Sequence, residues 1–160
     1  MATGFSPCAV VRIGVWSGVK GGGCIGLTAR GSQGVGFDVD LLVLGGGTIP
    51  TVDVLLRPSV VFPLAGTDPY FGLYGRVGAT ILGGSVPTGE GKGYARMGLS
   101  LGLGYDVALT EGIAIRVFEA SFYAEGQVAL LAPLANTVRM DRLGHHWDLG
   151  LMATTGITFH

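Results

Sequence analysis

The sequence predicts an all-β protein: an eight-stranded antiparallel up-and-down transmembrane β-barrel that forms a single domain over residues 1–160. Three observations lead to this fold class. Eight segments alternate with the two-residue period of a β-strand. Breaks rich in glycine, proline or polar turn residues separate these segments. Only 13% of the residues are charged, against roughly 25% in soluble domains.

The expected strands follow the alternation from one turn to the next. They cover residues 8–17, 23–30, 35–44, 51–61, 70–82, 93–107, 112–123 and 146–159. No segment keeps the 3.6-residue period of a helix. The sequence also contains no run of 18 uncharged apolar residues, which is about the length that a transmembrane helix needs. We therefore expect strands joined in chain order by hairpins and loops.

In the first four segments, the charged side chains fall on one parity and uncharged apolar side chains fall on the other. In residues 35–44, for example, Asp38 and Asp40 alternate with Phe37 and Val39. Each segment therefore has one polar and one apolar face. The charged residues of these four polar faces are Arg12, Arg30, Asp38, Asp40, Asp53 and Arg57.

The last four segments repeat this pattern with one interruption. In ARMGLSLGLGYDV, residues 95–107, leucines alternate with glycines and a serine. In residues 112–123, Glu119 falls on the apolar parity unless one extra residue near Phe118 forms a β-bulge, and we expect that bulge. The charged residues of these four polar faces are then Arg76, Arg96, Arg116, Glu119 and Asp148.

This alternation fits either a soluble barrel with an apolar interior or a membrane barrel with an apolar exterior. The charged face is too sparse for a soluble surface. Eight of the ten basic residues are arginines, the type that suits desolvated ion pairs. We therefore predict that the charged residues named above form a near-neutral network inside a narrow barrel. The predicted lipid-facing residues include Leu99, Leu101, Leu103, Leu149, Leu151 and Phe159.

The aromatic residues are predicted to form two interfacial girdles. One set of strand ends carries Phe62, Tyr70, Phe71, Tyr105 and Phe159, and the other carries Trp16, Tyr94, Phe122, Tyr123 and Trp147. Aromatic packing inside the molecule is the alternative, because Trp16 and Tyr94 have inward parity. The two cysteines, Cys8 and Cys24, are expected at opposite ends of a hairpin, about 20 Å apart at 3.3 Å per residue. We therefore expect two free inward thiols and no disulfide.

Three stretches resemble the small bacterial outer-membrane β-barrel superfamily (OmpA/OmpX-like). They read VDVLLRPSVVFPLAGTDPYFGLYGRVGATI, LGYDVALTEGIAIRVFEASFY and LGLMATTGITF. The likeness covers residues 51–159, and it departs from the family signal in that His160 follows the terminal aromatic Phe159. The resemblance implies a barrel in the bacterial outer membrane with both termini in the periplasm. An exported chain needs a signal peptide, and the opening MATGFSPC lacks one, so we expect Met1 to replace a removed signal.

The resemblance also assigns the connections to the two sides of the membrane. GSQG, FPLAGTDP and ALTE are expected as periplasmic turns. GVKGG, GGGTIP, GGSVPTGEGK and residues 124–145 are expected as extracellular loops. The last loop is unusually apolar, and an exposed apolar patch usually means contact. The residues that could dock a protein partner, enter the outer leaflet or pack on the barrel are Val128, Leu130, Leu131 and Leu134.

The expected function is that of a non-enzymatic outer-membrane protein with a sealed lumen and a structural, adhesive or partner-docking role. A small pore or hydrophobic-solute carrier is one alternative. The other is a hydrolase of lipid A or peptides, with His145, His146 and Asp148 at the rim; however, the His-x-Ser pattern of deacylases is absent. Adjacent strand residues point to opposite faces, which disfavours a metal site there.

The expected partners are outer-membrane lipid and lipopolysaccharide, with no cofactor. The glycine-rich loops lack the spacing of a phosphate-binding loop. Nucleic acid is not expected as a partner, because the basic residues form no run.

Overall fold

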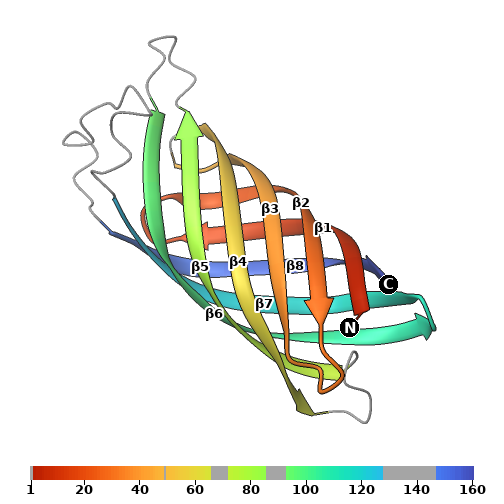
Figure 1. Ribbon diagram of the computed structural model, residues 1–160. Coiled ribbons are helices and arrows are strands. Elements are labelled where there is room, and N and C mark those ends of the chain that lie inside the picture. The colour runs from red at the N-terminus through yellow and green to blue at the C-terminus, as the bar shows by residue number, and fades with distance from the viewer. Residues whose placement is uncertain (1, 49, 66–71, 86–92, 128–146) are drawn as a thin grey trace.

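The computed structural model describes residues 2–48, 50–65, 72–85, 93–127 and 147–160. Eight antiparallel strands pair in chain order, and β8 pairs with β1, so the sheet closes into a barrel (Figure 1). The predicted fold class is confirmed. The strands are β1 Ala2–Gly14, β2 Gly18–Arg30, β3 Gly36–Gly46, β4 Thr51–Ala65, β5 Gly72–Ser85, β6 Gly93–Thr110, β7 Ile113–Gln127 and β8 Trp147–Phe159.

The strands are staggered as in a tilted barrel. Following directly paired residues once around the sheet starts at Ala2 in β1 and returns through Met152 of β8 to Arg12, a shift of ten residues from 2 to 12. A stagger of this kind tilts strands by about 35–45° and leaves an eight-stranded barrel only wide enough for side chains. Phe5 pairs with Phe159, so the two chain ends lie side by side (Figure 1).

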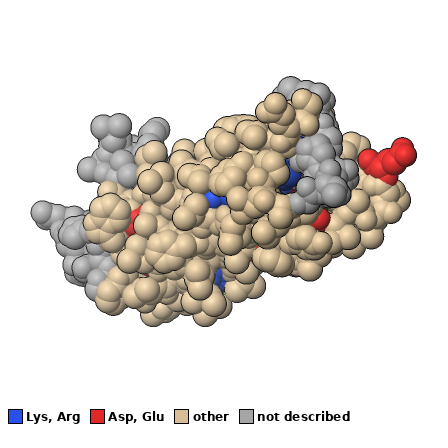
Figure 2. Space-filling model, turned by 90° about the horizontal axis from the view of Figure 1, so that it is seen from below, with Lys and Arg blue, Asp and Glu red and all other residues tan. Residues whose placement is uncertain are grey.

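The two faces of the sheet differ in chemistry. Leu99, with 69% of its surface exposed, faces outward, whereas Arg76 is fully buried. Among the described residues, Glu111 is the only charged side chain that is exposed. The face in Figure 2 accordingly shows few acidic or basic atoms. No helix in the described ranges has the length and apolarity to span a membrane.

Several strands extend beyond the predicted limits into the expected loops. GVKGG lies within β2, and the first hairpin turns at residues 15–17 instead. β3 takes in the first glycines of GGGTIP, β5 takes in the start of GGSVPTGEGK, and β7 continues through Gln127. Glycines have no side chain to mark alternation, so the sequence pattern fades before the strand pairing ends. The turn at GSQG lies where it was predicted, closed by a hydrogen bond from the Gly31 amide to the Val35 carbonyl.

The predicted β-bulge in the seventh strand is confirmed. The pairing of β7 with β8 shifts between Arg116 and Glu119, so Val117 and Phe118 both face outward while Glu119 turns into the barrel. The hydroxyl of Thr155, on the outer face of β8, donates a 2.9 Å hydrogen bond to the Arg116 carbonyl at the bulge. This bond supplies a partner for a backbone oxygen where the regular ladder is interrupted.

The prediction of two separate cysteines is wrong. Cys8 and Cys24 are directly paired across β1 and β2, their Cα atoms are 4.9 Å apart, and they form a disulfide. The error lies in the hairpin limits: β1 begins at Ala2, and the turn falls at residues 15–17, midway between the cysteines. Each cysteine therefore lies eight residues from Trp16, the centre of the turn.

The predicted aromatic girdle at the strand ends remote from the chain termini is wrong for two of its members. Tyr94 and Tyr123 are buried inside the barrel, at 9% and 1% exposure, because they share the parity of the charged residues. Trp16 and Trp147 are exposed at that end, whereas Phe122 is exposed two residues from the middle of β7. Tyr105 and Phe159 are exposed toward the chain ends, where Phe62 is half-buried. Tyr70 and Phe71 lie outside the described residues.

Candidate functional site

The chemically distinctive part of the molecule is the barrel interior, where charged side chains form two sets. Among the described residues, seven basic and seven acidic side chains are buried. The loop-end network, near the strand ends remote from the chain termini, consists of Arg12, Lys20, Asp53, Arg96, Glu125 and Asp148. The termini-end network consists of Arg30, Asp38, Asp40, Arg57, Arg76, Asp106, Arg116 and Glu119. Each network has as many cations as anions, which is the condition for burying charge at tolerable cost.

The loop-end network contains two groups of contacts. Arg12 donates a 2.5 Å hydrogen bond to Glu125, lies 3.6 Å from Asp148, and stacks 3.9 Å from the centre of the Tyr123 ring. Asp148 also lies 3.4 Å from Arg96. These contacts fasten β1, β6, β7 and β8 to one another across the lumen.

The second group is centred on Lys20. Its ammonium donates 2.5 Å hydrogen bonds to the Asp53 carboxylate and the Thr51 hydroxyl. The Tyr94 hydroxyl also donates to Asp53. A lysine in the lumen is thus paired and hydrogen-bonded from β4 and β6, as a buried ammonium requires.

The termini-end network is organised around Glu119. This carboxylate lies 2.7 Å from Arg57, 3.0 Å from Arg76 and 3.3 Å from Arg116. It also accepts a 3.0 Å hydrogen bond from the Tyr74 hydroxyl. Because the β-bulge alone turns Glu119 inward, the bulge positions the centre of this network.

Asp40 and Asp106 make the other ion pairs of the termini-end network. Asp40 lies 2.7 Å from Arg57 and 2.5 Å from Arg76. Asp106 lies 3.3 Å from Arg116 and 3.8 Å from Arg30. Most members therefore have two or more partners of opposite charge.

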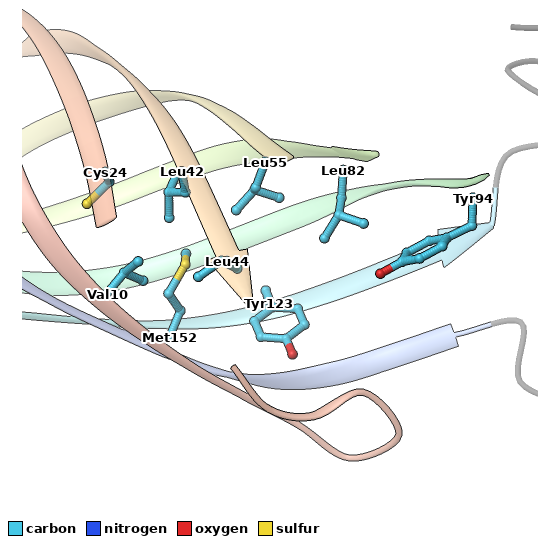
Figure 3. Close-up of a cluster of buried hydrophobic side chains, with 9 residues drawn as sticks. All are labelled: Val10, Cys24, Leu42, Leu44, Leu55, Leu82, Tyr94, Tyr123 and Met152. Carbon is cyan, nitrogen blue, oxygen red and sulfur yellow. The ribbon is translucent and has the colours of Figure 1, made fainter. Parts of the chain in front are cut away.

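A cluster of buried hydrophobic side chains lies inside the barrel and receives a side chain from every strand (Figure 3). Its members are Val10, Cys24, Leu42, Leu44, Leu55, Leu82, Tyr94, Tyr123 and Met152. Along β4, Leu55 stands between Asp53 of the loop-end network and Arg57 of the termini-end network. None of the ion pairs among the described residues joins the two networks.

Inward glycines give the large side chains their space. A side chain at Gly104 would overlap the ring of Tyr74, and one at Gly84 would overlap Tyr94 and Asp53. The glycine-rich polar face noted in the sequence is therefore the inner wall of a crowded lumen.

All eleven residues predicted for the interior network are buried, with at most 8% of their surface exposed. Three further members escaped the prediction. Lys20 and Glu125 were assigned to loops, although both continue the inward parity of their strands, and Asp106 has inward parity but was left out. Extending the alternation through the neighbouring glycines would have found the first two.

The six residues predicted to face lipid are all on the outside of the barrel, between 42% and 69% exposed. The predicted docking residues Val128, Leu130, Leu131 and Leu134 lie outside the described residues, as do His145 and His146. Asp148, considered for the rim, is instead buried within the loop-end network. In the described part of the chain, no three His, Cys, Asp or Glu side chains gather as metal ligands would.

Three of the solved structures that resemble this chain match it over nearly its whole length. Neisserial surface protein A (NspA) superposes with a TM-score of 0.61 at 15% sequence identity, covering 98% of this chain and 96% of that one. The N-terminal β-barrel domain of Pseudomonas aeruginosa OprF gives 0.57 at 12% identity, with 96% of each chain covered. Ail, the attachment invasion locus protein of Yersinia pestis, gives 0.52 at 14% identity, covering 98% of this chain and 97% of that one.

This chain has the fold of the small eight-stranded outer-membrane β-barrels. No protein-family model and no curated protein sequence matches it. At these identities, the likeness of this barrel to the three structures concerns the fold alone. Its role has to be argued from its own residues.

Proposed function

We propose that this protein is an integral barrel of a bacterial outer membrane, non-enzymatic, with a closed lumen and a structural, adhesive or partner-docking role at the cell surface. The observation that carries the proposal is the inverted polarity of the barrel. Wherever the strands are described, their outer face carries no charged side chain, Glu111 lying beyond the end of β6, and the charges lie inside. Exposing such an apolar surface to water costs free energy, whereas the hydrocarbon core of a membrane requires a barrel with an apolar outer face.

The orientation follows the chain ends. In barrels of this superfamily the termini are periplasmic, so the termini end of this barrel would face the periplasm and the loop end would face outward. The disulfide between Cys8 and Cys24 fits this location, because disulfides persist in the periplasm and outside the cell but are rare in a reducing cytosol.

Two features support a closed lumen. The buried ion pairs cross the barrel at two levels, and water or ions would have to displace charged side chains that already have partners. Between these levels, apolar side chains of the cluster such as Leu42, Leu55 and Met152 fill part of the lumen and offer a permeating ion nothing to replace its hydration. Narrow apolar constrictions of this kind block conduction by excluding water.

The proposed surface role depends on the loops between the strands. Ail, one of the proteins with this fold, is named for attachment and invasion, and its matched structure holds a heparin analogue. That ligand is a property of Ail. For this chain we propose that the apolar residues 128–134 contact a protein partner, since an interior filled by its own side chains leaves the loops to carry specificity.

Folding into micelles tests the barrel, and planar bilayers then test the lumen. We expect the folded protein to migrate faster on a gel before heating than after it, and to give no stable conductance steps. Steady ohmic steps from the unmodified protein would support a small pore and contradict the closed lumen. Solubility as a monomer without detergent would overturn the membrane location.

A further inference from the structure

The outer face of the barrel is hollowed by a groove of about 550 Å³ that crosses β4 to β7. Its walls include Phe62, Leu101, Leu103, Phe118 and Phe122. Every side chain that lines it is hydrocarbon. The groove therefore belongs to the apolar band and is separate from the charged lumen.

The groove exists because two small residues occur among large ones. Ala120 lies on the outer face of β7 between Phe118 and Phe122, which are roughly 13 Å apart at 3.3 Å per residue. On β5, Gly75 presents no side chain, and the ring of Phe62 lies close above it. Leu103 pairs with both small residues from the strand between them, so the depression runs across the strands.

We propose that this groove holds one acyl chain of a phospholipid from the periplasmic leaflet. This inference rests on the proposed function, because the groove is continuous with the face assigned to lipid. A slender, flexible chain can follow a curved depression between aromatic rings. An unfilled depression would forfeit the dispersion contacts of its walls, and in a bilayer such contacts drive apolar association.

The choice of leaflet follows from the position of the groove along the strands. Phe62 is three residues from the termini end of β4, and Gly75 is three residues from the termini end of β5. Phe118 is five residues from the termini end of β7. With the termini in the periplasm, these residues lie in the inner leaflet, which consists of phospholipid, whereas lipopolysaccharide occupies the outer leaflet.

The test compares Ala120→Phe, which fills the groove, with Ala153→Phe. Ala153 is a matched control: it is the directly paired residue on β8, it also faces outward, and it does not line the groove. Both variants and the unmodified protein are folded in micelles containing phosphatidylethanolamine and lipopolysaccharide. Native mass spectrometry then counts the lipids that each protein retains.

We expect one phosphatidylethanolamine on the unmodified protein and on Ala153→Phe, and at least fivefold lower occupancy on Ala120→Phe. Equal retention by all three proteins, retention of lipopolysaccharide alone, or no retained lipid would overturn the inference. A dimer that Ala120→Phe dissociates would overturn it in favour of a second copy in the groove. The heat-dependent gel shift, measured on each sample, separates these outcomes from failure of the barrel itself.

Discussion

Replacing Glu119 with leucine is the sharpest test of the charged interior. The change removes a carboxylate that faces three arginines at 2.7–3.3 Å and accepts a hydrogen bond from Tyr74. The termini-end network would then hold four arginines against Asp38, Asp40 and Asp106. Breaking a buried ion pair by removing one partner costs about 3–5 kcal/mol, because the other charge stays buried.

The value expected for Glu119→Leu is near the middle of that range. Arg57 and Arg76 keep Asp40, and Arg116 keeps Asp106, so no arginine is left without a carboxylate. We therefore expect the free energy of unfolding to fall by about 4 kcal/mol. Combining Glu119→Leu with Arg116→Leu restores neutrality, and the double variant is expected to be more stable than the sum of the single effects by about 1–3 kcal/mol.

Urea unfolding in micelles measures these values. Trp16 and Trp147, the two tryptophans of the chain, report unfolding by fluorescence, and the gel shift reports barrel closure independently. Glu111→Gln, at the one exposed charged side chain described, is the control and is expected to change stability by less than about 0.5 kcal/mol. If Glu119→Leu costs no more than this control, or if the two leucine substitutions simply add, the carboxylate does not hold the network together.

Three further predictions concern other parts of the barrel. Leu101→Arg places a charge on the outer face and is expected to cost about 2–4 kcal/mol in vesicles, while Leu101→Val costs little; tolerance of the arginine would contradict the orientation. Thr155→Val removes the hydroxyl that donates to the carbonyl at the bulge and is expected to cost about 1–2 kcal/mol; Thr155→Ser, which keeps the hydroxyl, should unfold near the urea midpoint of the unmodified protein. Replacing Cys8 and Cys24 together with serine is expected to cost about 3 kcal/mol, since the disulfide closes a loop with a sequence separation of 16. Reductant should lower the stability of the unmodified protein by the same amount and leave the serine variant unchanged, and a midpoint insensitive to reductant would argue against the bond.

The alternation of side chains was enough to predict the strand number and the bulge near Phe118, whereas the antiparallel order was predicted from the hairpin turns and the family resemblance. A two-residue period is local, and a single carboxylate on the wrong parity reveals an extra residue. Where the alternation was hidden or a residue type suited two environments, the predicted position of the residue was wrong. Lys20 was placed in a loop because the glycines beside it hid the continuing alternation. Glu125 was placed in a loop because the end of its strand was uncertain. Tyr94 and Tyr123 were placed in a girdle because tyrosine suits both an interface and a buried polar site.

The sequence alone therefore determined which face of each strand is polar, because that property depends on the identity of successive residues along a strand. Only the closed barrel decided which residues meet. The pairing of Cys8 with Cys24 depends on where the first hairpin turns, and the contact of Arg12 with Glu125 depends on the ten-residue stagger accumulated around all eight strands. Residues 113 positions apart become neighbours only when the last strand pairs with the first, and no local pattern encodes that distance.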